Sequence, residues 1–196
     1  MSAKSLHDSA LETLGSWTAP DEHHEVVRQT MLAFLASSSR GCLREWEPGH
    51  LTASSLILDQ GLCHVLLTLH PRVGRWIQLG GHCEESDETI QDAARREAVE
   101  ESGISDLVLD PEPLSLHTHA ITCSLGVPTR HLDVQFLAIA RPNAHIVRSS
   151  ESTDLRWFPV DELPDGAETS TINRLVGLAR ARRAAPDVHT ARPELA

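Results

Sequence analysis

The run from Gly80 to Ile104 constrains this chain more than any other part of it. It combines a glycine pair, a polar turn, a helix-forming stretch rich in Ala, Glu and Arg, and a second glycine, Gly103, where a helix would stop. Ser86 or Asp87 is placed to cap the start of that helix. The segment therefore predicts a loop, a helix and a helix stop in direct succession.

Three glutamates of this helix would share one face. At about 100° per residue, Glu97, Glu100 and Glu101 fall within about a third of the circumference. Like charges at this spacing repel and raise each other's pKa values, and a hard divalent cation is the usual compensation. Oxygen ligands without His or Cys favour Mg²⁺ or Mn²⁺ over zinc. A solvated acidic helix face explains the same residues equally well.

The spacing of the fixed residues resembles the Nudix box. That motif has a glycine, five residues, a Glu, seven residues and then Arg-Glu-U-x-Glu-Glu-x-Gly-U, where U is a bulky aliphatic residue. From Glu88 to Ile104 the chain matches every fixed position except the first U, which is Ala98. Counted from Gly81, Glu88 comes one residue late. We therefore expect the extra residue to displace the loop more than the helix.

Carried over position by position, the resemblance implies a divalent metal, Mg²⁺ with Mn²⁺ as the alternative. The glutamates of the helix would hold it, and the backbone carbonyl of the glycine pair would add a ligand. In several relatives a Glu in the loop before a late strand also reaches the metals. The implied metal ligands are Glu97, Glu100, Glu101, Gly81 (or Gly80) and Glu151.

The resemblance also implies catalytic roles within the box. Arg96 would pair with Glu88 and brace the loop against the helix. Glu101 or Glu100 would orient the attacking water and accept its proton. The reaction would be hydrolysis of a nucleoside diphosphate linked to another group, X, by attack of water at phosphorus. Phosphoryl transfer needs mostly positioning and charge stabilisation, so a few acids and cations suffice.

The identity of X is left open, because loops decide among the many substrates of the family. Arg72 and Arg75 lie on a Gly/Pro loop just before the box, and guanidinium groups bind phosphate oxygens with forked hydrogen bonds. Polar side chains also alternate with apolar ones over 131–140, the strongest candidate for a central strand. A substrate-pocket wall and a strand with one wet face both explain the polar residues there, His131, Asp133 and Gln135.

Other histidines and cysteines invite competing interpretations. His117 and His119 share a face of the strand expected over 114–121, where an exposed sheet face is favoured over a metal site. His23 and His24 diverge on a helix, which favours packing or a dimer contact over a metal cluster. Cys83 lies in the box loop, where a small residue that fills the turn is favoured over a nucleophile.

Two other function classes stay open at this point. An isopentenyl-diphosphate-isomerase-like enzyme shares the fold but needs a reactive cysteine, for which Cys63 and Cys83 are the candidates. A non-catalytic nucleotide-sensing domain commonly loses the carboxylates of the box. Because the box glutamates are intact, the sequence favours a hydrolase over both.

The expected fold class is α/β, a Nudix-type α/β/α sandwich around a mixed β-sheet. Helical periodicity predicts two helices over 5–39 with a break at 19–21, where Asp21 would cap the second. A hairpin would precede the box, and a short strand at 76–79 would deliver its loop. A last helix is expected over 169–183. The predicted organisation is an N-terminal helical extension (1–45), a Nudix domain (46–184) and a C-terminal tail (185–196).

Composition limits the kinds of partner and the cellular location that we expect. The net charge of −11 argues against nucleic acid and anionic membranes. No apolar run has membrane-spanning length and the first residues do not read as a signal peptide, so we expect a cytoplasmic protein. The four cysteines include no Cys-x-x-Cys pair, and reduced thiols are expected. A homodimer is an expectation from the family alone.

Overall fold

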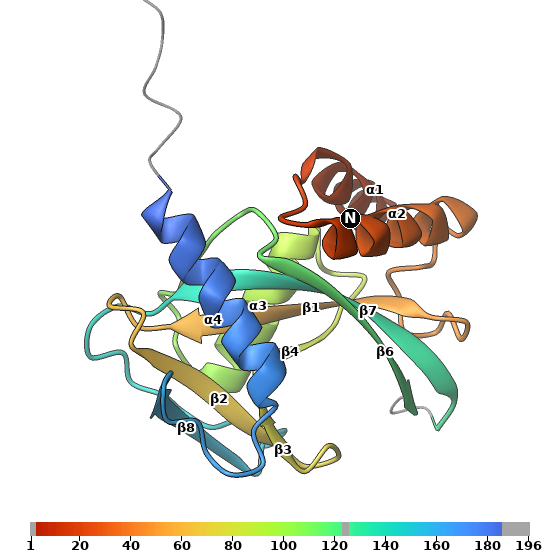
Figure 1. Cartoon of the computed structure of the whole chain (residues 1–196). Coiled ribbons are helices and arrows are strands. Elements are labelled where there is room, and N and C mark those ends of the chain that lie inside the picture. Colours follow the sequence, from red (N-terminus) through yellow and green to blue (C-terminus); the bar gives the residue numbers. More distant parts are fainter. Residues whose placement is uncertain (1–2, 123–125, 186–196) are drawn as a thin grey trace, which may run out of the picture.

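The computed structural model describes residues 3–122 and 126–185 (Figure 1). It begins with two helices, α1 (Ala3–Ser16) and α2 (Glu22–Ser37). Asp21 caps α2 as predicted, since its carboxylate accepts a hydrogen bond from the backbone N–H of His24 at 2.8 Å. The predicted extension is therefore a helical hairpin that precedes the sheet.

The described strands form one mixed sheet of eight members. Its centre is a parallel pair, in which β1 is aligned with β7 from His50 opposite His131 to Leu58 opposite Ile139. The other strand pairs are antiparallel. The strands are β1 (His50–Leu58), β2 (His64–His70), β3 (Arg75–Ile77), β4 (Leu79–His82), β5 (Val108–Leu109), β6 (Ser115–Thr122), β7 (Pro128–Ile139) and β8 (Asp154–Pro159).

The hairpin predicted before the box is present as β1 and β2, which pair with Ile57 opposite Leu66. The single short strand predicted at 76–79 is instead two strands. β3 pairs with β2, whereas β4 pairs with β1. The chain therefore changes neighbour between them, and β4 brings the glycine pair alongside β1.

Helices cover both faces of the sheet (Figure 1). On one face, α3 (Ile90–Ser102) packs with α1 and α2 over the odd-numbered residues at the start of β1, such as Leu51. On the other face, α4 (Thr169–Ala184) buries Leu175 against even-numbered residues such as Leu56. This alternation confirms the predicted α/β/α sandwich.

The C-terminal end of α3 agrees with the prediction, whereas its N-terminal end does not. Gly103 ends the helix in the left-handed conformation, with φ of 72°, as its sequence position predicts. The start is capped by Thr89, whose side chain accepts from the N–H of Asp92 while the Asp92 side chain accepts from the Thr89 N–H. The predicted cap at Ser86 or Asp87 is therefore wrong, because the extra residue moves the start of the helix further along the chain.

Residue 185 is the only part of the predicted tail (185–196) within the described residues, and the cysteine at 123 also lies outside them. Among the helices that the structure describes, none combines the length and apolar character needed to span a bilayer.

Candidate functional site

The glycine pair of β4 lets the carboxylates of α3 come close to the sheet. A Cβ on Gly80, where φ is +151°, would lie 2.4 Å from the Cα of Ser54 on β1. A Cβ on Gly81 would lie 2.7 Å from Oε2 of Glu97. At Gly80 the contact is with the backbone of β1, so only glycine fits there, whereas a Cβ at Gly81 would push the Glu97 carboxylate away. The glycines in the first half of the box therefore make room for the carboxylates in its second half.

Of the three glutamates predicted to share one face of α3, two are buried at this contact. Glu97 is 9% exposed and Glu101 is 5% exposed. Glu101 Oε2 accepts a hydrogen bond from the backbone N–H of Gly80 at 3.0 Å. Burial raises the pKa of Glu97 to about 7, against the opposing effect of Arg96, and raises that of Glu101 to about 8. The fold thus keeps two acids in a place where their charge is disfavoured.

The two remaining acids predicted as metal ligands are exposed. The side chain of Glu100 is 60% exposed, and Glu151 is exposed in the loop before β8. The negative charges of Glu100 and Glu151 both contribute to the raised pKa values of Glu97 and Glu101. The structure therefore brings the four acidic residues predicted as metal ligands into one electrostatic cluster.

Arg96 is held by Asp87 and not by Glu88. Its Nε and Nη2 donate to the two carboxylate oxygens of Asp87, each at 3.0 Å, and Nη1 donates to Glu97 at 2.9 Å and to Glu100 at 3.2 Å. Asp87 is 6% exposed, whereas Glu88 is exposed. The predicted pairing of Arg96 with Glu88 is therefore wrong.

The physical reason for this error is the position of the extra residue. Asp87 follows Gly81 at the interval that the family pattern gives its first glutamate, so the extra residue lies after Asp87, in the turn into α3. Asp87 also accepts the backbone N–H of Glu84 at 2.8 Å, which fixes its carboxylate in the loop. Counting forward from Gly81 would have found Asp87, but counting back from Arg96 finds Glu88.

The predicted alternation on β7 is confirmed, and its polar side is a buried network. Asp133 accepts hydrogen bonds from three side chains, at 3.0 Å, 2.7 Å and 3.1 Å. The amide oxygen of Gln135 accepts from Arg174 of α4 at 3.2 Å. The apolar side packs into the core that includes α1, α2 and α3. The three donors to Asp133 are Thr52, Ser54 and Gln135, and the apolar partners are Leu132, Val134 and Phe136.

His131 lies further along the same polar face, beside three other histidine rings. Its ring centroid is 5.0 Å from that of His50, 5.1 Å from that of His82 and 5.2 Å from that of His119. Burial, followed by the proximity of the other imidazoles, lowers the pKa of His82 to about 4 and that of His131 to about 3. These rings are therefore neutral at pH 7. Neither His50 nor His82 was a predicted site residue.

The two candidate phosphate-binding arginines have different surroundings. Arg75 lies in β3 with its Nη1 3.9 Å from a carboxylate oxygen of Glu168. Arg72 is exposed in the turn between β2 and β3, and its charge contributes to the lowered pKa of His82. The charge of Arg72 is therefore felt at His82, the last residue of β4, from which the box loop begins.

The cysteines give no support to a thiolate nucleophile in the box. Cys83 is buried, and burial raises its pKa well above the usual value for a thiol. Burial also raises the pKa of Cys42 to about 12. Cys63 is exposed in the turn between β1 and β2, where its thiol donates to the Gly61 carbonyl at 3.3 Å.

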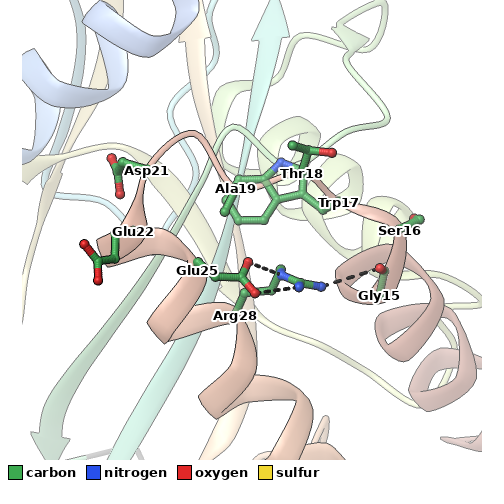
Figure 2. A pocket seen from close by; sticks show the side chains of 9 residues that line it. All are labelled: Gly15, Ser16, Trp17, Thr18, Ala19, Asp21, Glu22, Glu25 and Arg28. Carbon is green, nitrogen blue, oxygen red and sulfur yellow. Dashed lines mark hydrogen bonds and ion pairs between the residues drawn. The ribbon is translucent and has the colours of Figure 1, made fainter.

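A surface hollow lies at the turn between α1 and α2 (Figure 2). Its arginine, Arg28, donates to both carboxylate oxygens of Glu25 at 2.7 Å, and these bonds lower the pKa of Glu25 to about 2. His24 instead bonds to Ser115 of β6 at 3.0 Å and so joins α2 to the sheet. Since the cation is already paired, this hollow is poorly suited to a phosphate, and the candidate site stays with the box.

The mixed sheet between helices, with buried carboxylates of α3 against a glycine pair, defines an α/β domain of the Nudix type. The sequence model of the NUDIX domain matches residues 49–176. The chain therefore belongs to the Nudix family, and the match begins after α1 and α2.

Mouse oxidized purine nucleoside triphosphate hydrolase is 30% identical over an alignment of 115 residues that covers 51% of this chain and 61% of that protein. A Nudix-family hydrolase from Clostridium perfringens matches with a TM-score of 0.53 and 23% identity, over 68% of this chain and 97% of that one. A binary complex of Caenorhabditis elegans Ap4A hydrolase matches with a TM-score of 0.52 and 22% identity, over 68% and 97%. The NUDIX domain of Shewanella oneidensis NrtR, complexed with ADP ribose, matches with a TM-score of 0.54 and 18% identity, over 71% and 92%. These structural likenesses establish the fold.

Proposed function

We propose that this protein is a divalent-metal-dependent hydrolase that cleaves the pyrophosphate linkage of a nucleoside diphosphate derivative by attack of water at phosphorus. The observation that carries the proposal is the pair of buried carboxylates, Glu97 and Glu101, packed against the backbone of β4. Nucleotide hydrolases among the relatives support the same reaction class.

The residues of the cluster fit a hard divalent cation. Among the described residues, Arg96 is the cation in ion-pair contact with the cluster, and it reaches Glu97 and Glu100 but not Glu101. The donors are all oxygens, which suits Mg²⁺ or Mn²⁺. Glu97, Glu100 and Glu101 would hold the cation, with Glu151 and the carbonyl of Gly81 as further ligands. Such a cation would neutralise the diphosphate and lower the pKa of the attacking water.

The chain itself positions the acids. Nη1 of Arg96 donates to both Glu97 and Glu100 and so holds the two carboxylates close together, while Asp87 fixes the other side of the guanidinium. The N–H of Gly80 fixes Glu101 at one oxygen. Glu101 or Glu100 accepts the proton of the attacking water. Of the two side chains, Glu100 is the more exposed.

For the substrate, we infer contacts with Arg72 and with the polar face of the sheet. Arg72 would bind phosphate oxygens, since Arg75 leans toward Glu168. The polar sheet face would contact the group X, with Gln135 holding Arg174 in place and Asp133 shaping the wall. The substrate-binding role of His131 stays a prediction, as do the homodimer and the cytoplasmic location.

The test is a screen of nucleoside diphosphate derivatives with Mg²⁺, in which released phosphate and nucleoside monophosphate are measured. Oxidised purine nucleoside triphosphates and diadenosine tetraphosphate come first, because relatives carry those names. Turnover by the wild type that is lost in Glu101→Gln supports the proposal. Nucleotide binding without turnover would instead favour the sensing domain, and turnover that survives in Glu101→Gln would place the chemistry elsewhere.

A further inference from the structure

We propose that His50, His82 and His131 form a second metal site, for Zn²⁺ or another borderline divalent transition-metal ion, on the face of β4 opposite the box glutamates. The three residues come from β1, β4 and β7. This inference does not depend on the proposed hydrolase function, because none of the three histidines is a ligand of the proposed Mg²⁺ site and the ion is a different one.

The strand register brings the three imidazoles together. His50 pairs directly with His131 across the parallel pair β1 and β7. His82 is opposite Thr52, which is two residues beyond His50 and so on the same face. One ring nitrogen from each histidine lies within 4.8 Å of the other two. The site is thus built by three rigid strands and not by a loop.

These distances suit an ion that draws the rings slightly inward. With zinc–nitrogen bonds of about 2.0–2.1 Å, the ligand atoms of a tetrahedral site are about 3.3 Å apart. Small rotations of the three side chains close the difference. Imidazole nitrogen favours zinc and neighbouring transition metals over Mg²⁺. A set of three histidines leaves the fourth position to water or another small ligand.

The hydrogen bonding around the cluster resembles that of a metal site. Nδ1 of His50 lies 3.4 Å from the carbonyl oxygen of Trp46; a proton on Nδ1 would leave the lone pair on Nε2 for the metal. Nε2 of His131 is buried and has no hydrogen-bond partner among the described residues. Ring packing alone would leave that nitrogen unsatisfied at a cost in stability, whereas a bound ion would satisfy it.

The site is separated from the glutamates by the strand itself. A side chain on Gly81 would point at Glu97. Because successive residues of a strand point to opposite faces, the side chain of His82 points away from α3. Mg²⁺ on the carboxylates and Zn²⁺ on the imidazoles can therefore bind at the same time.

The experiment is a titration of the full chain with Zn²⁺, and separately with Co²⁺, in the presence of excess Mg²⁺. We expect one Zn²⁺ per chain that Mg²⁺ does not displace. Co²⁺ should give the strong visible absorption of a four- or five-coordinate nitrogen site, not the weak absorption of six oxygens. His131→Asn and His82→Asn should each weaken zinc binding by about a hundredfold or more, since loss of an outer hydrogen-bond partner alone costs about 10–100-fold.

Two control variants separate this site from the rest of the molecule. Glu97→Gln should keep the zinc affinity, and so should His64→Asn, which removes an exposed histidine that contacts Asp59. Zinc binding that Mg²⁺ displaces, that is lost in Glu97→Gln, or that is kept in His131→Asn would overturn the proposal. If a histidine variant does not fold by circular dichroism, the wild-type cobalt spectrum decides, and a purely six-coordinate spectrum also overturns it.

Discussion

Buried carboxylates lie on both faces of the sheet, but the two faces differ in how many hydrogen-bond donors and cations the protein supplies to them. On the face toward α3, Glu97 and Glu101 are buried, and Arg96 forms an ion pair with Glu97 but not with Glu101. On the face toward α4, Asp133 is as deeply buried, at 6% exposure. There the fold itself supplies three donors, from Thr52, Ser54 and Gln135.

The difference distinguishes a group that shapes the fold from one that binds a ligand. A buried charge that is fully hydrogen-bonded within the protein contributes to stability and needs nothing further. Buried charges without sufficient partners cost free energy, and natural proteins keep such groups at functional sites. We therefore interpret Asp133 as the residue that fixes β1 against β7, whereas Glu97 and Glu101 are the groups for which we propose a cation.

The largest expected effect is on catalysis. Glu101→Gln should lower kcat by about 10²- to 10⁴-fold, because it removes a carboxylate that can accept the proton of water. Its metal-free form should unfold at the same or a higher temperature than the wild type, since the amide cannot ionise at a position where burial disfavours the charge of Glu101. Steady-state kinetics and calorimetric melting check the two halves. A large loss of stability with unchanged kcat would show that Glu101 has a structural role and not a catalytic one.

The opposite pattern is expected on the other face. Asp133→Ala should destabilise the protein by about 2–4 kcal/mol, because it leaves the hydroxyls of Thr52 and Ser54 buried without their acceptor. Urea denaturation measures this loss, with Asp165→Asn as the exposed control that should change little. If Asp133→Ala were as stable as the control, the network on this face would not be a structural one.

Asp87 and Glu88 offer a matched pair of neighbours. Asp87→Asn should destabilise the protein by about 1–3 kcal/mol and lower activity, because it breaks the forked pair that holds Arg96. Glu88→Gln should change neither quantity appreciably, since Glu88 is exposed and the guanidinium is bonded to Asp87. Denaturation and kinetics on both variants decide. Equal sensitivity at the two positions would contradict the reassigned pairing.

The smallest expected effect is a pH dependence of stability in the metal-free protein. The folded-state pKa values of Glu97 and Glu101, about 7 and about 8, lie above the ordinary glutamate value of 4.5. Between these values the folded chain holds protons that the unfolded chain has released, so stability should fall as the pH rises from about 4.5 to about 8. Melting temperatures in a chelating buffer measure the slope, which should be shallower in Glu101→Gln and flatter with Mg²⁺. A slope of the opposite sign would show that burial does not dominate these pKa values.

Local patterns in the sequence predicted much of this arrangement. The spacing of the box gave α3 and its glutamates, Gly103 gave the end of the helix, and alternation over 131–140 gave the two faces of β7. These features depend on neighbours a few residues apart. The periodicity of a strand or helix is enough to place them.

What the sequence could not predict depends on distant contacts. The loop insertion fits before or after Asp87 equally well until the partner of Arg96 is seen. Arg174 contacts His24, which is 150 residues away in the sequence, and three strands are needed to bring the histidines together. No local pattern contains the register between strands, so such groups emerge only once the sheet is assembled.

Calorimetric titration of Mg²⁺ into the wild type and into Glu97→Gln tests whether the carboxylates of α3 bind the cation. The wild type should bind the ion and release protons on binding near pH 7, because the cation displaces protons from the buried carboxylates. Glu97→Gln should bind more weakly, since it lacks one anionic ligand. Equal affinity in the two proteins, with no proton release, would show that any Mg²⁺ binds away from α3.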